Sequence, residues 1–511
     1  VGELRGGYSW SMRILFGLRS RHDCGRVFLL GILVLAVLLV PGLTRALGQT
    51  SLSAPSLAPS TDSLPITTNS PEAAKLFEEG LRLRYDYHLE PALAKWREAT
   101  IRDPNFAQAW AYIVWLGLDP AEVKQAAEKA KLASQNVTPG EKLLVKWTIA
   151  TNEGRFLAAI AAMNDLLARY PHDAKLNYEA GLWLQSQGDF EGAVKFTKRA
   201  LEIDPTFAGA LNTLGYELAL LHDYDEAIFY LKRYVQAEPN DPNPRDSLAE
   251  ILQQAGRLDE SLAEYREALK LDARFYHSEN GLGDVYALLG NEDRARQEYA
   301  QALPMAETRQ DKLNCQIQSA ISYAREGNMK QARVELQAVL AEATKLQLNE
   351  YRSFIHLNLA LLAESRPAAF QYLDQAEADL QAPGHVAGKA RSRQLALTLR
   401  TRSRMAVEAG NLALARATVA RLQKMFQANR SNAVERAYHG ANGALLAAQS
   451  KAPAAIEELR EDPEDAFSMA KLAELQAAAG DAVGAAETRA RLKADYGTTL
   501  EDWLVVHGLK Q

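Results

Sequence analysis

Residues 177–205 read NYEAGLWLQSQGDFEGAVKFTKRALEIDP and combine two short amphipathic segments with a turn between them. Gly188 and Asp189 mark the turn, because glycine readily adopts the positive φ that ends a helix. Asp204 and Pro205 close the second segment, since proline cannot continue a helix but can open the next one. The stretch therefore predicts one antiparallel helix hairpin.

The same pattern recurs along the chain with a period of 34 residues. Four series of residues share this step: Gly154, Gly188, His222, Gly256 and Gly290; Ala159, Ala193, Ala227, Ser261 and Ala295; Trp147, Gly181, Gly215, Ala249 and Gly283; Pro171, Pro205, Pro239 and Ala273. Small residues such as Gly181 and Ala193 are expected where two helices cross closely, because overpacking a crossing costs about 1–3 kcal/mol. A repeat of this length predicts stacked hairpins that share one continuous core.

The predicted fold class is an all-α superhelical solenoid of about twelve helix hairpins, which begins at residue 71. Residues 71–310 form the regular array and residues 311–498 a more divergent one. Hydrophobic residues make up 47% of the chain and charged residues 24%, which is typical of a folded globular protein. Residues 499–511 are expected to form a C-terminal cap in which Trp503, Leu504 and Val505 close the open end; the alternative is that this apolar tail docks a partner.

The N-terminal residues indicate export from the cytoplasm. Residues 1–26 form a basic region, and residues 27–48 contain an apolar run followed by small residues, as in the h- and c-regions of a signal peptide. An uncleaved membrane anchor over residues 27–43 is the alternative. In either case the folded body is expected in the periplasm or elsewhere outside the cytoplasmic membrane, with membrane contact only through this segment.

Residues 49–70 read QTSLSAPSLAPSTDSLPITTNS and are rich in Ser, Thr and Pro. Such a segment buries too little apolar surface to offset its conformational entropy. We therefore expect a disordered linker between the N-terminal segment and the array.

Composition and motifs argue against several function classes. The net charge of −6 gives no basic field for nucleic acid. The two cysteines, Cys24 and Cys315, cannot build a disulfide framework or a thiolate zinc site, and Cys315 reads as a structural thiol on an apolar helix face. No metal-binding histidine motif and no nucleophile elbow occurs. The sequence predicts no catalytic residues, no metal and no cofactor, and hence no enzyme.

Residues 181–205, GLWLQSQGDFEGAVKFTKRALEIDP, resemble the tetratricopeptide repeat (TPR) family at nearly every signature position. SPEAAKLFEEG (70–80), IRDPNFAQAWAYI (101–113) and TPGEKLLVKW (138–147) are more narrowly similar to extracytoplasmic TPR arrays of bacterial membrane-bound regulators, a likeness that covers roughly residues 70–310. The family resemblance implies a non-catalytic scaffold that binds peptides or proteins. The narrower resemblance implies an alternative, a sensor or regulatory module that acts with a membrane signalling partner.

In this family the first helix of each hairpin lines an inner groove, so its exposed face supplies candidate ligand contacts. The matching residues here are Tyr178, Gln185, Asn212, Tyr216, Asn243, Asp246, Glu250, Gln253, His277, Asn280 and Asp284. Asp246, Glu250 and Asp284 disfavour the C-terminal carboxylates that some family members clamp. The sequence predicts a neutral or basic peptide, or a partner with a basic patch; the alternative is that these side chains serve only solubility.

Overall fold

The structure, a computed structural model, describes residues 63–85, 88–117, 119–381, 388–428, 431–493, 497 and 499–510. Within these residues it contains 25 α-helices, one short 3-10 helix and no strand. The all-α fold class predicted from the sequence is confirmed. The expected basic region 1–26 and the expected signal or anchor 27–48 lie outside the described residues. No helix in the described part of the chain is long and apolar enough to cross a membrane.

The described chain forms two compact units, the N-terminal unit (residues 63–186 and 191–205) and the C-terminal unit (residues 187–190 and 206–510). The N-terminal unit contains α3 (Pro71–Tyr85), α4 (Leu89–Arg102), α5 (Ala107–Leu116), α6 (Pro120–Ala133), the 3-10 helix η2 (Ser134–Asn136), α7 (Pro139–Asn152), α8 (Phe156–Arg169), α9 (Ala174–Ser186) and all but the first residue of α10 (Phe190–Ile203). The C-terminal unit contains α11 (Ala208–Leu220), α12 (Tyr224–Ala237), α13 (Pro242–Gln254), α14 (Leu258–Leu271), α15 (Tyr276–Leu288), α16 (Glu292–Ala302), α17 (Arg309–Arg325), α18 (Met329–Lys345), α19 (Asn349–Leu361), α20 (Arg366–Gln381), α21 (Gly388–Glu408), α22 (Leu412–Ala428), α23 (Asn432–Ala448), α24 (Ala452–Arg460), α25 (Ala466–Ala478), α26 (Ala482–Lys493) and α27 (Leu500–Lys510).

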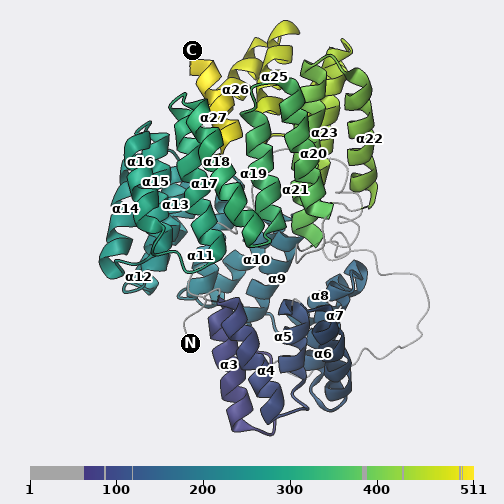
Figure 1. Cartoon of the computed structure of the whole chain (residues 1–511). Coiled ribbons are helices and arrows are strands. Elements are labelled where there is room, and N and C mark those ends of the chain that lie inside the picture. Colours follow the sequence, from purple (N-terminus) through teal and green to yellow (C-terminus); the bar gives the residue numbers. More distant parts are fainter. Residues whose placement is uncertain are drawn as a thin grey trace, which may run out of the picture. The chain divides into compact units, whose positions relative to one another are not determined.

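Helices α3 to α26 follow one another as twelve pairs, the number that the repeat length predicts (Figure 1). The odd-numbered member of each pair is called its first helix and the even-numbered member its second helix. Each first helix from α11 to α25 packs against its own second helix, and successive pairs pack against each other. The core is therefore distributed along each unit rather than gathered at one centre.

Small residues do lie where paired helices cross, as the sequence predicts. A Cβ atom added at Gly215 would lie 2.5 Å from Cγ of Leu231, and one at Gly443 would lie 2.6 Å from Cγ of Leu459. In both pairs the facing residue comes 16 positions later and is large. At Gly181 the nearest facing group is the Thr197 hydroxyl at 2.5 Å rather than a small residue. Glycine on the first helix thus makes room for a bulky side chain on the second.

The turns within the pairs also follow the sequence pattern. Gly188, Gly256 and Gly290 have φ values of 82°, 76° and 76°. His222 stands at the same position of its repeat and adopts φ 60°. The left-handed backbone at this point is therefore a property of the repeat, and glycine favours it because it has no Cβ.

The expected disordered linker 49–70 is corrected at its end. Residues 49–62 lie outside the described residues, but residues 64–69 follow a defined path on the N-terminal unit. Their backbone and hydroxyl groups hydrogen-bond to the carboxylates of Asp103, Glu141 and Asp173. Composition misses this order because the stabilising partners are distant in sequence. Residues 64–69 are called the strap below.

The C-terminal helix α27 also differs from the expected cap. Leu500, Trp503 and Leu504 pack in the core of α17, α18 and α19, whereas Val505 packs with α24, α25 and α26. Figure 1 shows α27, in yellow, beside α17. The apolar tail therefore bridges the last pair to repeats far earlier in the sequence, instead of closing the end alone.

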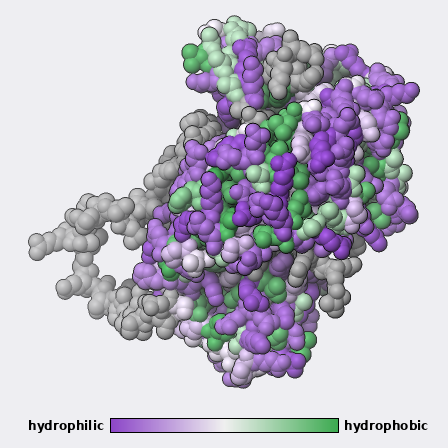
Figure 2. All heavy atoms as spheres, turned by 90° about the vertical axis from the view of Figure 1, so that its left-hand side faces the viewer, coloured by the Kyte–Doolittle hydropathy of each residue, from purple (hydrophilic) through white to green (hydrophobic). Residues whose placement is uncertain are grey.

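The described residues on the side that carries α12, α14 and α16 are mainly hydrophilic, with hydrophobic residues in narrow stripes between them (Figure 2). This side presents second helices.

Candidate functional site

Polar side chains form three columns along the first helices of the C-terminal unit, because the 34-residue repeat places equivalent residues on neighbouring helices. These polar columns consist of Asn212, Asp246, Asn280 and Asn314; Tyr216, Glu250, Asp284 and Gln318; and Asn243, His277 and Asp311. Each column takes one residue from each successive first helix. The polar columns contain eight of the eleven predicted groove residues.

Most of the predicted groove residues are buried, which contradicts the exposure expected of them. Nine of them are at most 9% exposed: Tyr178, Gln185, Asn212, Asp246, Glu250, Gln253, His277, Asn280 and Asp284. Tyr216 and Asn243 are half-buried. Neighbouring first helices, such as α11, α13 and α15, pack against each other and cover these side chains. Their role in binding remains a prediction.

Hydrogen bonds link the polar columns from one repeat to the next. The Tyr216 hydroxyl donates to Oε2 of Glu250 at 3.0 Å. Ser278 Oγ donates to Oδ1 of Asp246 at 2.8 Å. The thiol of Cys315 donates to Oδ1 of Asn280 at 3.6 Å. Polar groups that the sequence suggests are free for a ligand are thus partly engaged with the adjacent repeat.

Other bonds tie the polar columns to the second helices. The Tyr299 hydroxyl donates to Oδ1 of Asp284 at 2.9 Å, and Nδ2 of Asn243 donates to the Tyr234 hydroxyl at 3.0 Å. Burial raises the pKa of Tyr299 well above its ordinary value, and the nearby Asp284 carboxylate adds to the rise. Tyr299 therefore stays neutral and acts as a donor to the Asp284 carboxylate.

The polar columns are acidic. Asp246, Glu250, Asp284 and Asp311 are buried in them, and His277 is their one basic side chain. Burial raises the pKa of Asp311, although the hydrogen bond from Thr308 and the nearby His277 oppose the rise. A ligand that brings neutral donors or positive charge complements this surface better than an anion does.

Some buried amide groups here have no hydrogen-bond partner among the described residues. They are Oδ1 of Asn212, Oε1 of Gln253 and Oδ1 of Asn314 in the C-terminal unit, and Nε2 of Gln185 in the N-terminal unit. A buried polar atom without a partner costs about 1–3 kcal/mol. A ligand that supplies a hydrogen-bond donor or acceptor to these atoms would remove this cost.

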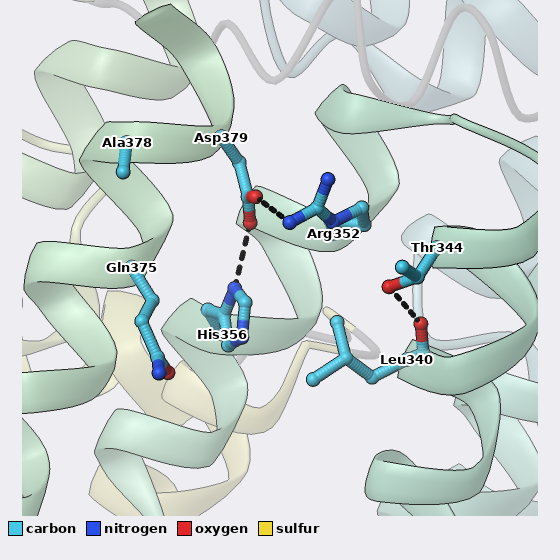
Figure 3. Close-up of a pocket in the computed structure, with 7 residues that line it drawn as sticks. All are labelled: Leu340, Thr344, Arg352, His356, Gln375, Ala378 and Asp379. Atoms are coloured by element: carbon cyan, nitrogen blue, oxygen red, sulfur yellow. Dashed lines mark hydrogen bonds and ion pairs between the residues drawn. The ribbon is translucent and has the colours of Figure 1, made fainter. Parts of the chain in front are cut away.

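A cavity of about 250 Å³ lies among α18, α19 and α20 (Figure 3). Asp379 stands at its edge and accepts from a guanidinium NH2 of Arg352 at 2.5 Å and from Nδ1 of His356 at 2.7 Å. Leu340 and Gln375 lie on either side of the His356 imidazole (Figure 3). The Thr344 hydroxyl donates to the Leu340 carbonyl at 2.7 Å.

This cavity supports hydrogen bonding rather than nucleophilic chemistry. Asp379 binds Nδ1 of His356 and thereby orients the imidazole ring. The Thr344 hydroxyl is engaged with a carbonyl of its own helix. The space suits a single side chain rather than a drug-sized molecule, whose pockets start at about 300 Å³.

Sequence reasoning missed Arg352, His356 and Asp379. The spacing of Arg352 and His356, four residues apart on one helix face, was an available signal. Asp379 lies on the following helix, α20. The 34-residue period is no longer regular there, so the sequence did not predict that Asp379 faces Arg352 and His356. The predicted structural role of Cys315 is supported, since it is buried and burial raises the pKa of its thiol to about 12.

Comparisons with known proteins agree with the repeat pattern. Two tetratricopeptide repeat models match the chain, one over residues 184–251 and the other over residues 150–206 and 247–311. No curated protein sequence matches it.

Several solved structures are similar to parts of the chain. A tetratricopeptide repeat protein from Parabacteroides merdae is 13% identical, with coverage of 60% of this chain and 99% of that one and a TM-score of 0.34. YrrB, described as a TPR protein with an unusual peptide-binding site, is 18% identical, with 41% and 96% coverage and a TM-score of 0.28. MamA from Desulfovibrio magneticus is 18% identical, with 32% and 94% coverage and a TM-score of 0.30. Residues 150–311 of this chain match the tetratricopeptide repeat family.

Proposed function

We propose that this protein is a non-catalytic scaffold of the bacterial cell envelope that binds an extended peptide or protein segment along its first helices. Tetratricopeptide repeats indicate a protein-interaction scaffold in general, and the matching models point to no catalytic family. The main observation behind binding along the first helices concerns three buried amide oxygens. Those of Asn212, Gln253 and Asn314 have no hydrogen-bond partner among the described residues. An extended peptide that reaches these oxygens would supply backbone N–H donors to them.

The acidic polar columns define the preferred ligand. Asp246, Glu250 and Asp284 carry carboxylates and accept hydrogen bonds from neutral donors. A neutral or basic segment adds donors without like-charge repulsion, whereas a terminal carboxylate would be repelled. The proposed partner is therefore an uncharged or basic stretch of polypeptide.

The proposed location rests on the N-terminal sequence. Five arginines precede the apolar run that starts at Val27, as in a secretory signal or a membrane anchor. Export would deliver the array outside the cytoplasmic membrane. N-terminal sequencing of the mature protein tests this: a start near Gln49 indicates cleavage, and retention of residues 27–43 indicates an anchor.

The proposed binding is tested with the double variant Asn212→Ala and Gln253→Ala. Crosslinking in intact cells followed by mass spectrometry identifies the peptides held by the unmodified array. The variant is expected to fold, because its two missing oxygens have no partner among the described residues, and to capture those peptides about tenfold less well.

The matched control is Gln297→Ala with Gln301→Ala, which removes two exposed amides from the second helix α16. The control should capture the same peptides at the original yield. Equal capture by the test variant, with helicity and melting unchanged, would contradict binding along the first helices.

The alternative function is a sensor or regulatory module that acts with a membrane signalling partner. Retention of residues 27–43 as an anchor would favour this function, because a membrane-fixed array can report ligand binding to a neighbouring membrane protein. The same N-terminal sequencing therefore separates the two candidates.

A further inference from the structure

The strap lies against the starts of three successive first helices of the N-terminal unit, α5, α7 and α9. One carboxylate at each start receives it: Asp103 before α5, Glu141 in the first turn of α7, and Asp173 directly before α9. All three are at most 8% exposed. They come from three different repeats, so the strap crosses a surface built by stacking. This surface is called the carboxylate edge below.

Asp173 divides its two oxygens between its own helix and the strap. Oδ1 accepts from the backbone N–H of Leu176 at 3.0 Å, which caps α9. Oδ2 accepts from the backbone N–H of Leu64 at 2.8 Å. The strap bond is thus additional to the cap and does not replace it.

Glu141 makes the densest set of strap contacts. Oε1 accepts from the backbone N–H of Thr67 at 2.8 Å, and Oε2 accepts from the Thr67 hydroxyl at 2.7 Å. The same carboxylate completes a capping box with Thr138 at the start of α7. Gln108 donates both to Glu141 and to the carbonyl of Pro65. The middle of the strap therefore both donates hydrogen bonds to Glu141 and accepts one from Gln108.

Asp103, the third carboxylate, also uses one oxygen for a local bond and the other for the strap. Oδ1 accepts from the backbone N–H of Asn105 at 2.9 Å, inside the turn that leads to α5. Oδ2 accepts from the Thr68 hydroxyl at 2.5 Å and from the backbone N–H of Asn69 at 3.1 Å. Each carboxylate thus keeps at least one local bond and also accepts hydrogen bonds from the extended strap.

The strap is recognised by its backbone and hydroxyl groups rather than by apolar burial. Its recognised donors are the N–H groups of Leu64, Thr67 and Asn69 and the hydroxyls of Thr67 and Thr68. The side chain of Ile66 is 36% exposed. A competitor that makes the same hydrogen bonds can therefore replace a segment held in this way.

We propose that the carboxylate edge is a docking site for an extended, uncharged peptide with adjacent hydroxyl side chains, and that the strap is an internal ligand which such a partner segment displaces. The site differs from the polar columns of the C-terminal unit and extends the proposed function to a second surface. The caps at α7 and α9 and the Asp103–Asn105 turn before α5 do not involve the strap, so the edge keeps its shape for the incoming segment. A partner must compete with a tethered ligand at an effective concentration in the millimolar range.

The test uses the full chain and a labelled peptide, Ser-Leu-Pro-Ile-Thr-Thr-Asn-Ser, that copies residues 63–70. The variant Thr67→Pro removes the N–H and the hydroxyl that Glu141 receives, and so disengages the strap. Fluorescence anisotropy should show that this variant binds the peptide about tenfold or more tightly than the unmodified chain does. A peptide N-methylated at Thr67 should lose that affinity.

The control variant is Ile66→Ala, which alters an exposed strap side chain and keeps every strap hydrogen bond. It should bind the peptide as weakly as the unmodified chain. Adding Glu141→Gln to Thr67→Pro should reverse the gain. Equal peptide binding by Thr67→Pro and the unmodified chain would overturn the proposal.

Hydrogen exchange of the full chain keeps the proposal testable if Thr67→Pro disturbs folding. The strap amides of the unmodified chain should exchange about a hundredfold faster than amides in the middle of α7, because the strap opens without unfolding of the unit. Exchange of both at the same rate would show that the strap is an inseparable part of the fold, and would overturn the proposal.

Discussion

The two units satisfy their buried polar groups in different ways. In the N-terminal unit the partners come from far along the chain: the strap reaches Asp173, and Arg84 at the end of α3 pairs with Glu179 of α9. In the polar columns of the C-terminal unit partners also come from the next repeat, as when Tyr216 donates to Glu250. The N-terminal unit should therefore depend on a few long-range contacts, while the polar columns of the C-terminal unit behave as nearest-neighbour links.

The largest effect is expected from Arg84→Ala, which breaks a long-range pair. Glu179 is fully buried and would lose its charged partner, so the free energy of unfolding of the N-terminal unit should fall by about 3–5 kcal/mol. Urea denaturation followed by tryptophan fluorescence measures the change. Arg102→Ala, which removes an exposed arginine from α4, should change it by less than about 0.5 kcal/mol. Equal effects of the two variants would contradict the distinction.

The next effect concerns α27, the long-range element of the C-terminal unit. Leu500 is 1% exposed in the core of α17, α18 and α19, so Leu500→Ala should cost about 2–5 kcal/mol. Hydrogen exchange should accelerate in α17 as well as in α25. Val483→Ala, on an exposed face of α26, serves as the control. Acceleration confined to the helices next to α27 in sequence would show that it is a simple end cap.

A smaller effect is expected from breaking one nearest-neighbour link. Tyr216→Phe removes the donor to Glu250 and should cost about 1 kcal/mol, with faster exchange limited to α11 and α13. Tyr286→Phe, whose hydroxyl accepts from Arg266, is the matched control and should cost less. Spread of the Tyr216→Phe effect to α17 would contradict nearest-neighbour behaviour.

The strap contacts and the buried glutamates of the C-terminal unit should respond to pH in opposite directions. Burial alone would raise the pKa of Asp103 and Glu141, but hydrogen bonds that include those of the strap hold both values below the ordinary 3.8 and 4.5. Their contribution to stability is present above about pH 4.5 and is lost as the pH falls through the lowered values. Strap release should therefore increase in acid.

In the C-terminal unit, burial raises the pKa of Glu279 and of Glu292 to about 7. The folded state binds these protons more tightly than the unfolded state, so their contribution is present below about pH 4.5 and is lost as the pH rises through 7. Amide hydrogen exchange at pH 4, 5.5 and 7.5 compares the stability of the strap with that of the C-terminal unit. If both become more stable, or both less stable, as the pH rises, these pKa assignments are contradicted.

The repeat geometry was predictable because it rests on local chemistry. The left-handed turn at Gly188 and the tight crossing at Gly215 follow from a fixed step of small residues. Even His222, which breaks the glycine series, was placed correctly by its register. The residues that recur periodically are those that every repeat needs in order to fold and to pack against the next repeat.

The site chemistry was less predictable because it depends on contacts between distant segments. Asp246 and Glu250 were expected on an exposed face, but neighbouring first helices cover them. Thr67 belongs to a segment whose composition indicates disorder, and it is ordered by Glu141, 74 residues away. A Ser/Thr/Pro-rich stretch gives no sign of the carboxylates that stacking brings together.

The most direct test of these contacts is residue-resolved amide hydrogen exchange of the strap in the full chain at pH 6. The N–H groups of Leu64, Thr67 and Asn69 donate to buried carboxylates and should be protected. Those of Ile66 and Thr68 have no hydrogen-bond acceptor among the described residues and should exchange faster. This alternating pattern is the result that the account predicts. Uniform exchange of all five amides at the rate of a free peptide would contradict it.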